Sequence, residues 1–118
     1  MNLKELIESA LDIPALELSD PLLPPCATWY KTMDYPSLIG DGIETETTEV
    51  YEIDIWSRER ADIITKTELL RRRLATEIGA LLPVASFNYD INGKMWRGNI
   101  KFNYIKEDTN GIEEIKSN

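Results

Sequence analysis

The chain has 118 residues, of which 42% are hydrophobic, and a formal net charge of −8. This size and composition predict a single domain that buries its core without metals or disulfides. With one cysteine, Cys26, and no histidine, the sequence excludes an internal disulfide, the usual zinc sites and Ser/His or Cys/His nucleophile pairs. The acidic balance argues against nucleic-acid binding through phosphates. Apolar runs are short and residues 1–14 carry acids, so we expect a soluble protein without a membrane span or secretion signal.

The charge is distributed unevenly along the chain. Residues 1–56 contain 2 basic and 12 acidic side chains, whereas residues 57–118 contain 11 basic and 9 acidic side chains. Copies of such a chain could assemble with the acidic region of one against the basic region of the next. Monomeric proteins also show uneven charge, so this observation leaves both states open.

An N-terminal helix is predicted over residues 3–11, where leucine, isoleucine and alanine recur at helical spacing. Asn2 is its expected N-cap, Glu5 completes a partial capping box, and Pro14 limits the helix. Residues 19–25 contain three prolines and predict an irregular connector.

A strand is predicted at residues 27–33, followed by a loop at 34–42 that contains one proline and two glycines. Residues 50–56 alternate between apolar and polar side chains, which is the pattern of a half-buried strand. The segment 44–49 continues this second strand outward. We therefore expect the two strands to form a long β-hairpin that projects beyond the sheet.

From Ala61 to Leu82 the hydrophobic period becomes that of an amphipathic helix of about five turns. Its expected buried stripe consists of Ile63, Thr67, Leu70, Leu74, Ile78 and Leu81. Gly79 and Pro83 bracket the expected end of the helix. The stripe is expected to pack against the apolar side of the 50–56 strand.

Two further strands are predicted at 84–91 and 96–105, joined at Asn92-Gly93, the strongest short hairpin signal in the sequence. The predicted fold class is therefore α+β, with a four-stranded, mainly antiparallel sheet and two helices on one face. The predicted order of elements is helix, strand, strand, helix, strand, strand.

The predicted domain comprises residues 1–106. Residues 107–118 are polar, with isoleucine only at 112 and 115, and predict a mobile C-terminal tail.

Four acidic residues are expected on one face of the second strand and its extension: Glu44, Glu46, Glu52 and Asp54. Carboxylates two positions apart on a strand lie about 7 Å from each other, so they could share a hard metal ion or act as a paired acid and base. No lysine follows at the spacing of a metal nuclease. A solvated acidic face explains these residues more simply, and we predict no catalytic residue, cofactor site or metal site.

Arg71, Arg72 and Arg73 point in directions about 100° apart and lie between core positions, which indicates a solvated helix face. Ion pairs with an acidic neighbouring subunit are the alternative. On that alternative, the candidate subunit contacts on the helix side are Arg58, Arg71 and Arg72.

Leu38 and Ile39 lie in the glycine-flanked loop, where a purely solvated segment would disfavour them. They could dock on a partner or pack against the base of their own loop. The large aromatic side chains could likewise be partner anchors or core residues: Trp29, Tyr30, Trp56 and Trp96. Cys26 has no basic neighbour in the sequence and is expected to be a small buried or semi-buried residue beside the prolines.

The segment VYEIDIWSRERADIITKTELLRRRL, residues 50–74, joins a strand that ends in Ile-Asp-Ile-Trp-Ser to a short basic turn and an amphipathic helix. This pattern resembles the tail-completion, or tail terminator, proteins that join head to tail in long-tailed phages and prophages. The motif match is best over residues 50–82, and the order of elements covers nearly the whole chain. The acidic segment 44–49 and the polar tail do not match the family's pattern.

The resemblance implies a structural protein without cofactors, not an enzyme. Such proteins form a ring, usually of six subunits, at the head-proximal end of the virion tail after assembly in the host cytoplasm. The expected partners are other copies, the tail tube protein and a head-completion or connector protein, and DNA passes through the ring without sequence-specific binding. An acidic face at Glu44, Glu46, Glu52 and Asp54 would line the channel and repel DNA, and Leu38 and Ile39 would dock on the tail tube.

Two other functions remain open. The chain could be another head–tail connector or neck component with a similar small fold. From a different class, a small acidic binding or inhibitor module that mimics nucleic acid would also fit the net charge and the lack of histidine. An enzyme is the weakest interpretation, and a metal enzyme would change its melting temperature with Mn²⁺ or Mg²⁺.

Overall fold

The computed structural model describes residues 2–17, 20–40 and 43–107. The elements, in chain order, are α1 (Leu3–Leu11), β1 (Ala15–Leu16), β2 (Cys26–Gly40), β3 (Ile43–Ser57), α2 (Arg60–Ala75), β4 (Ala80–Asp90) and β5 (Met95–Glu107). The protein is therefore α+β with two helices, as predicted. No helix within the described residues is long and apolar enough to cross a membrane. The predicted tail lies almost wholly outside the described residues, because 108–118 are not among them.

The sheet has five strands in the order β1-β2-β3-β5-β4, so the predicted count of four is wrong. The additional strand, β1, pairs in parallel with Ala27 and Thr28 of β2, while all other neighbouring strands are antiparallel. The backbone N–H of Ala27 also donates to the carbonyl of Pro14 at 2.9 Å. A strand of two residues shows no periodicity, which explains why the sequence pattern does not predict it.

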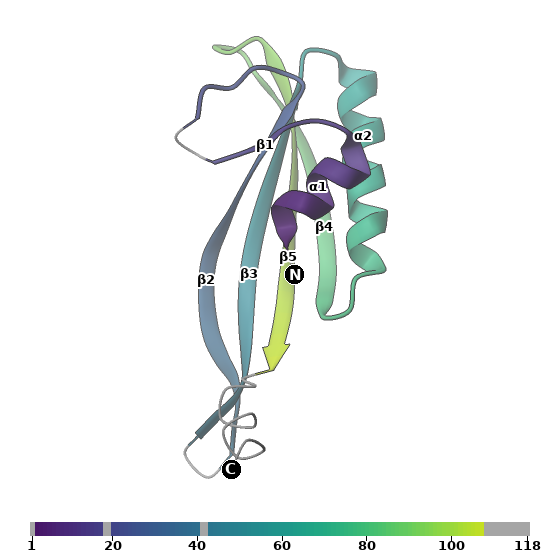
Figure 1. Cartoon of the computed structure of the whole chain (residues 1–118). Coiled ribbons are helices and arrows are strands. Elements are labelled where there is room, and N and C mark those ends of the chain that lie inside the picture. Colours follow the sequence, from purple (N-terminus) through teal and green to yellow (C-terminus); the bar gives the residue numbers. More distant parts are fainter. Residues whose placement is uncertain (1, 18–19, 41–42, 108–118) are drawn as a thin grey trace.

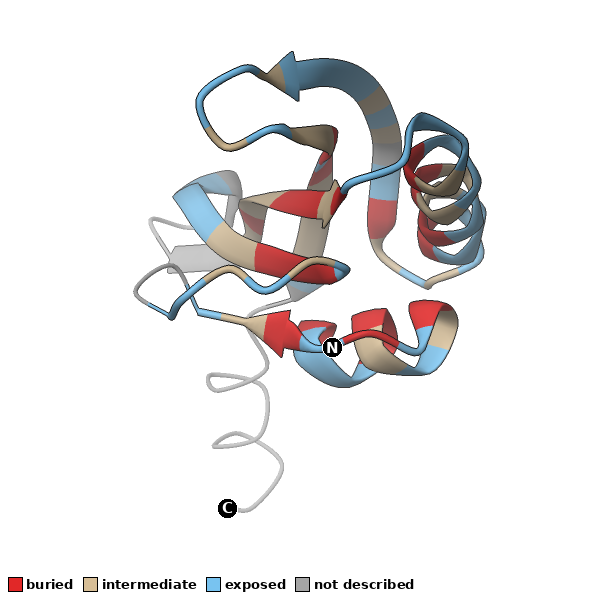
Figure 2. Ribbon diagram, turned by 90° about the horizontal axis from the view of Figure 1, so that it is seen from above, coloured by how far each residue is buried: buried red, intermediate tan, exposed pale blue. Residues whose placement is uncertain are grey.

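Both helices cover the same face of the sheet, and the buried residues gather where the helices and the sheet face each other (Figures 1 and 2). Alternation places the apolar side chains of β3 and β5 on this face, where they meet the apolar stripes of the helices. The core consists of Leu3, Leu6, Ile7, Leu11, Ile13, Ala15, Ala27, Ile53, Ile55, Ile63, Leu70, Leu74, Ala80, Ile100 and Phe102. We call the opposite side of the sheet the helix-free face.

Strands β2 and β3 form a long hairpin that continues beyond the level of both helices (Figure 1). Most of the predicted loop at 34–42 is therefore strand, since pairing with β3 continues to Gly40. The register shifts between Lys31 and Met33, between Pro36 and Leu38, and between Leu38 and Ile39, so the pairing is irregular on both sides of Pro36. The projecting hairpin itself was predicted, and it contributes to dimensions of 55 × 27 × 21 Å.

Helix α2 ends earlier than the sequence pattern predicts. Its C-cap is Thr76, whose Oγ1 donates to the carbonyl of Arg73 at 2.8 Å. The next residues turn toward β4 through Gly79, which has a φ of +90° and whose carbonyl accepts from the N–H of Ile105 at 2.9 Å. Ile78 lies in this turn and is 92% exposed, so its predicted place in the buried stripe is wrong. Leu81 was also predicted to be buried but is exposed on β4.

Helix α1 forms as predicted. Oδ1 of Asn2 accepts from the N–H of Glu5 at 3.1 Å, and Asp12 ends the helix in the left-handed conformation. Strand β4 begins at Ala80, earlier than predicted, and tolerates Pro83 because it is the edge strand of the sheet.

Candidate functional site

The helix-free face carries charged and amide side chains in the middle of the sheet. Alternation places Glu52 and Asp54 of β3 on this face together with Arg97, Asn99 and Lys101 of β5. The antiparallel register sets Glu52 opposite Lys101 and Asp54 opposite Asn99. Each acid of β3 therefore lies beside a donor on β5, and we call these five residues the charge-paired strip.

Asp54 is the centre of the strip and is only 5% exposed. Its Oδ1 accepts from Nε of Arg97 and from Nδ2 of Asn99, both at 2.8 Å. The guanidinium of Arg97 donates this hydrogen bond to Asp54, which raises the pKa of Arg97, whereas burial acts to lower it. A buried carboxylate whose Oδ1 accepts from a guanidinium and from an amide forms a structural ion pair.

Glu52 extends the same network toward the projecting hairpin. Its Oε1 accepts from Nδ2 of Asn99 at 3.0 Å and lies 3.7 Å from Nζ of Lys101. Its side chain is mostly buried. The prediction of a solvated acidic face is therefore wrong for Glu52 and Asp54, because basic and amide side chains of β5 cover and neutralise them.

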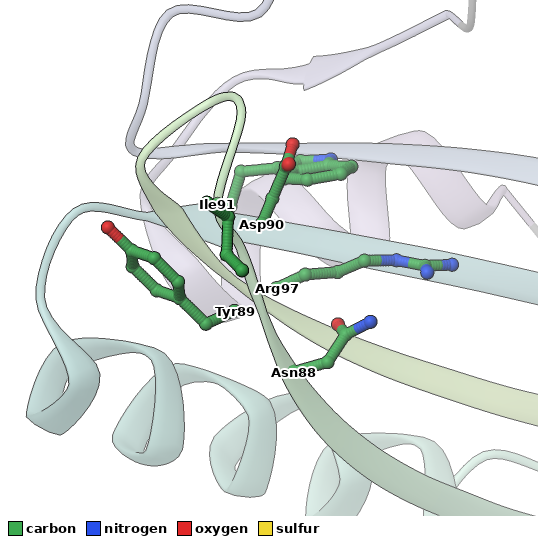
Figure 3. Close-up of a pocket in the computed structure, with 6 residues that line it drawn as sticks. Asn88, Tyr89, Asp90, Ile91 and Arg97 are labelled. Atoms are coloured by element: carbon green, nitrogen blue, oxygen red, sulfur yellow. The ribbon is translucent and has the colours of Figure 1, made fainter.

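A shallow pocket of about 320 Å³ lies at the end of the strip nearest the β4–β5 turn. Figure 3 shows Arg97 and Asn88 extending to one side of their strands, while Tyr89 extends to the other. The guanidinium of Arg97 lies 5.9 Å from the ring centroid of Trp56, whose indole N–H donates to Oγ1 of Thr28 at 3.3 Å. This arrangement fixes the aromatic ring and the cation together.

Tyr30 of β2 lies opposite Glu52 of β3, beside the strip. Burial, together with the negative charges of Asp54 and Glu52, raises the pKa of its phenol. Burial likewise raises the pKa of the thiol of Cys26, which is fully buried as predicted. Within the described residues, no group of three or more histidine, cysteine or acidic side chains could hold a metal ion.

The Trp-Ser sequence at the end of β3 holds the start of helix α2. Oγ of Ser57 donates to Oδ2 of Asp62 at 2.7 Å and accepts from the N–H of Glu59 at 3.3 Å. Nζ of Lys66, one turn further along α2, contacts the other oxygen of Asp62. These contacts lower the pKa of Asp62, the contact with Lys66 most of all. The motif that carries the family resemblance is thus a structural junction between strand and helix.

The structure does not bring the predicted contact residues into one site. Arg58 is exposed just before α2, whereas Arg71 and Arg72 lie near its C-terminal end. Arg71 donates to Glu68 through Nε at 3.1 Å and Nη2 at 2.8 Å. Arg72 is exposed and forms no ion pair within the described part of the chain.

The contacts expected at the hairpin tip remain predictions. The structure does not describe the side chains of Leu38, Ile39 and Glu44, although their backbones belong to β2 and β3. Glu46 is described and half-buried.

Sequence reasoning missed two features. The first is the set of partners on β5, whose polar alternation is visible in the sequence but whose register against β3 is not. The second is the edge strand β4, which exposes apolar side chains on both of its faces: Leu81, Val84, Phe87 and Tyr89. The signal for this second feature was present, because residues 80–89 contain no charged side chain.

No protein-family model matches this sequence, and no curated protein matches it either.

Proposed function

We propose that this chain is a tail-completion, or tail terminator, subunit of a long-tailed phage or prophage that forms a ring at the head-proximal end of the tail. The observation that carries the proposal is the β3–α2 unit, which has the strand, the Trp-Ser junction and the amphipathic helix of the motif. The junction is built by Ser57, Asp62 and Lys66, so the residues of the motif have a definite structural role.

The shape of the molecule supports the proposal. The β2–β3 hairpin projects beyond the helices and makes the molecule twice as long as it is wide, at 55 × 27 × 21 Å. A subunit of this shape can contribute its globular part to a ring and extend its hairpin toward the adjoining component. Leu38 and Ile39, at the far end of the hairpin, are the proposed contacts with the tail tube.

The charge-paired strip is compatible with a channel through which DNA slides. Arg97 and Lys101 are the cations of the strip, and each is paired with an acid of β3. Paired cations offer little attraction to phosphate, and an overall negative protein repels DNA. We propose that Glu44 and Glu46, on the hairpin, contribute negative charge to the channel face.

The same pairing argues against the acidic inhibitor alternative. A protein that mimics nucleic acid must present exposed carboxylates at a spacing that resembles phosphates. Asp54 is buried and Glu52 is mostly buried, so the centre of this sheet face does not present them. Another neck component with a similar fold would share every feature described above, and partner binding separates it from a tail terminator.

Light scattering on the eluting peak of the purified chain, with and without tail tubes assembled from the tube protein of the same phage, tests the proposal. We expect a mass near six times 13.5 kDa, or rings seen by negative-stain microscopy on tube ends only when tubes are present. A chain that stays monomeric and ignores the tubes would contradict the proposal. Rings that bind the connector but never the tube would instead favour the neck component.

A further inference from the structure

From Val84 to Tyr89, the outer edge of β4 lacks the features that normally protect a sheet edge. The strand has 11 residues, about 36 Å, and pairs only with β5 among the strands that the structure describes. Natural edge strands carry charges, bulges or prolines that discourage pairing with another chain. In β4 the bulge and Pro83 lie near the start of the strand and Asp90 lies at its end, but from Val84 to Tyr89 the strand is uncharged and contains no bulge or proline. Val84 is 63% exposed, and Phe87 and Tyr89 are exposed on the helix side.

The opposite edge of the sheet, at β2, is also open, and the direction of β2 allows it to pair with β4 of another copy. Strand β1 covers β2 only at Ala27 and Thr28, so from Trp29 onward the outer edge of β2 pairs with no strand within the described residues. β2 is antiparallel to β3, β3 to β5, and β5 to β4, so β4 runs antiparallel to β2. A second copy in the same orientation would therefore place its β2 antiparallel to β4 of the first copy.

The side chains at corresponding levels of the two edges are compatible. Leu81 of β4 shares a row across the sheet with Asn103, Val50 and Met33 of β2. Leu81 and Met33 both lie on the helix-free face and are exposed. Pairing at this level would cover both apolar side chains.

The charges on the helix side are also complementary. Asp34 and Glu49 share a row with Ala80, the first residue of β4, and lie on the helix side of the hairpin. Both contact Lys31, at 2.8 and 3.4 Å, so two carboxylates share one cation. Helix α2 ends at the same level, four residues before β4, where Arg72 is exposed and unpaired within the described chain.

We propose that β4 of one subunit pairs with the open edge of β2 of a second copy of this chain, with Arg72 facing Asp34 and Glu49 of that copy. The contact is heterologous, because it joins different surfaces of the two copies, and repetition about an axis can close a ring. Pairing of β4 with β4 is disfavoured, because it would set the two α2 helices beside each other, and each carries five basic and two acidic residues. This inference rests on the proposed ring and names its subunit interface.

Charge exchange tests the contact. Arg72→Glu and Asp34→Arg should each reduce assembly at least tenfold in concentration, because each sets like charges together. An equimolar mixture of the two variants should assemble again, since interfaces with both charges exchanged can alternate with interfaces in which Arg72 faces Asp34. The matched control is Lys4→Glu, an equal charge reversal on α1 that should leave assembly unchanged. A mixture that fails to assemble while both folded variants give normal spectra overturns the contact.

Covalent trapping provides a second test. Oxidation of the Met33→Cys, Leu81→Cys double variant should give a ladder of linked oligomers, whereas either single variant should remain unlinked. Cys26 is buried and should not contribute. Particles of six-subunit mass that do not cross-link, and that tolerate the charge variants, would overturn the edge pairing while leaving the ring proposal intact. A ladder without an upper limit would support the edge pairing but contradict a closed ring. A chain that is monomeric with and without tail tubes overturns both.

Discussion

Gly98 of β5 lies directly under Thr67 of α2, so close that a Cβ placed on the glycine would be 2.0 Å from Thr67 Oγ1. The same Cβ would lie 3.2 Å from Cβ of Thr67 and 3.3 Å from Cγ1 of Ile63. Helix α2 therefore rests on the backbone of β5, and the absence of a side chain at position 98 sets the distance between the helix and the sheet.

We expect Gly98→Ala to lower the free energy of unfolding by about 1–3 kcal/mol, because the added methyl group must displace the helix. At an uncrowded strand position, alanine would instead be favoured over glycine. Chemical denaturation of Gly98→Ala, Thr67→Ala and the double variant measures the coupling. The double variant should lose less free energy of unfolding than the two single variants lose together, since removing Oγ1 relieves the clash. Additive effects would mean that the two residues do not press on each other.

The hydroxyl of Thr67 is buried without a hydrogen-bond partner within the described residues. Replacing it with a methyl group in Thr67→Val should raise the free energy of unfolding by about 1 kcal/mol, because an unsatisfied buried polar group is removed. Thr67→Ser is the matched control, since it keeps the hydroxyl, loses a methyl group and should be less stable than the native chain. If valine lowers the midpoint of urea denaturation as serine does, the hydroxyl has a partner in solution.

Arg97 and Lys101 both pair with acids of β3 but differ in burial. Arg97→Met would leave the carboxylate of Asp54 buried with Asn99 as its remaining side-chain donor among the described residues, and we expect a loss of about 2–4 kcal/mol. Lys101→Met removes an exposed lysine that is 3.7 Å from Glu52 and should cost less than about 1 kcal/mol. Thermal unfolding of the two variants gives the comparison, and equal losses would show that burial of the pair is unimportant.

The contacts of Asp62 predict a dependence of stability on pH. Hydrogen bonds from Lys66 and Ser57 hold its folded pKa below the usual 3.8. The ionised form therefore stabilises the fold above pH 3.8, and this contribution is lost as the pH falls through the folded pKa. Asp62→Asn should unfold more easily than the native chain at pH 7, by about 0.5–1 kcal/mol, and the difference should shrink below pH 3.8.

Glu59→Gln is the control for this experiment, because it removes a carboxylate at the same end of α2 that makes no capping hydrogen bond. It should show a smaller difference at pH 7. A loss in Asp62→Asn that persists unchanged into acid would assign its effect to packing and not to the ion pair.

The elements with strong periodicity could be predicted from the sequence. The alternation of β3 and β5 and the stripe at Ile63, Thr67, Leu70 and Leu74 identify which face of each element is buried. The capping of α1 by Asn2 is local and was also predicted. Contacts within a few residues are encoded by spacing, so sequence patterns reveal them directly.

The features that sequence reasoning missed depend on contacts far apart in the chain. Asp54 and Arg97 are 43 positions apart, and only the pairing register of β3 and β5 brings them together. Without that register, the acids of β3 resemble a solvated face. The segment that contains Pro36 and Gly40 likewise resembles a loop in the sequence. It forms a strand because the long partner strand β3 stabilises an extended backbone that local propensity disfavours.

At the end of α2, the local spacing of apolar residues and the observed structure give different boundaries for the helix. Ile78 continues the helical spacing of Leu74, but the cap at Thr76 places it in an exposed turn. We therefore expect Leu74→Ala to cost about 2–5 kcal/mol, since Leu74 is fully buried. Ile78→Ala should change the free energy of unfolding by less than about 0.5 kcal/mol. Urea denaturation of both variants decides between the two boundaries, because a large loss at Ile78 requires a helix that continues through the turn. If Ile78→Ala instead leaves stability unchanged but weakens subunit assembly, its exposed side chain belongs to an interface.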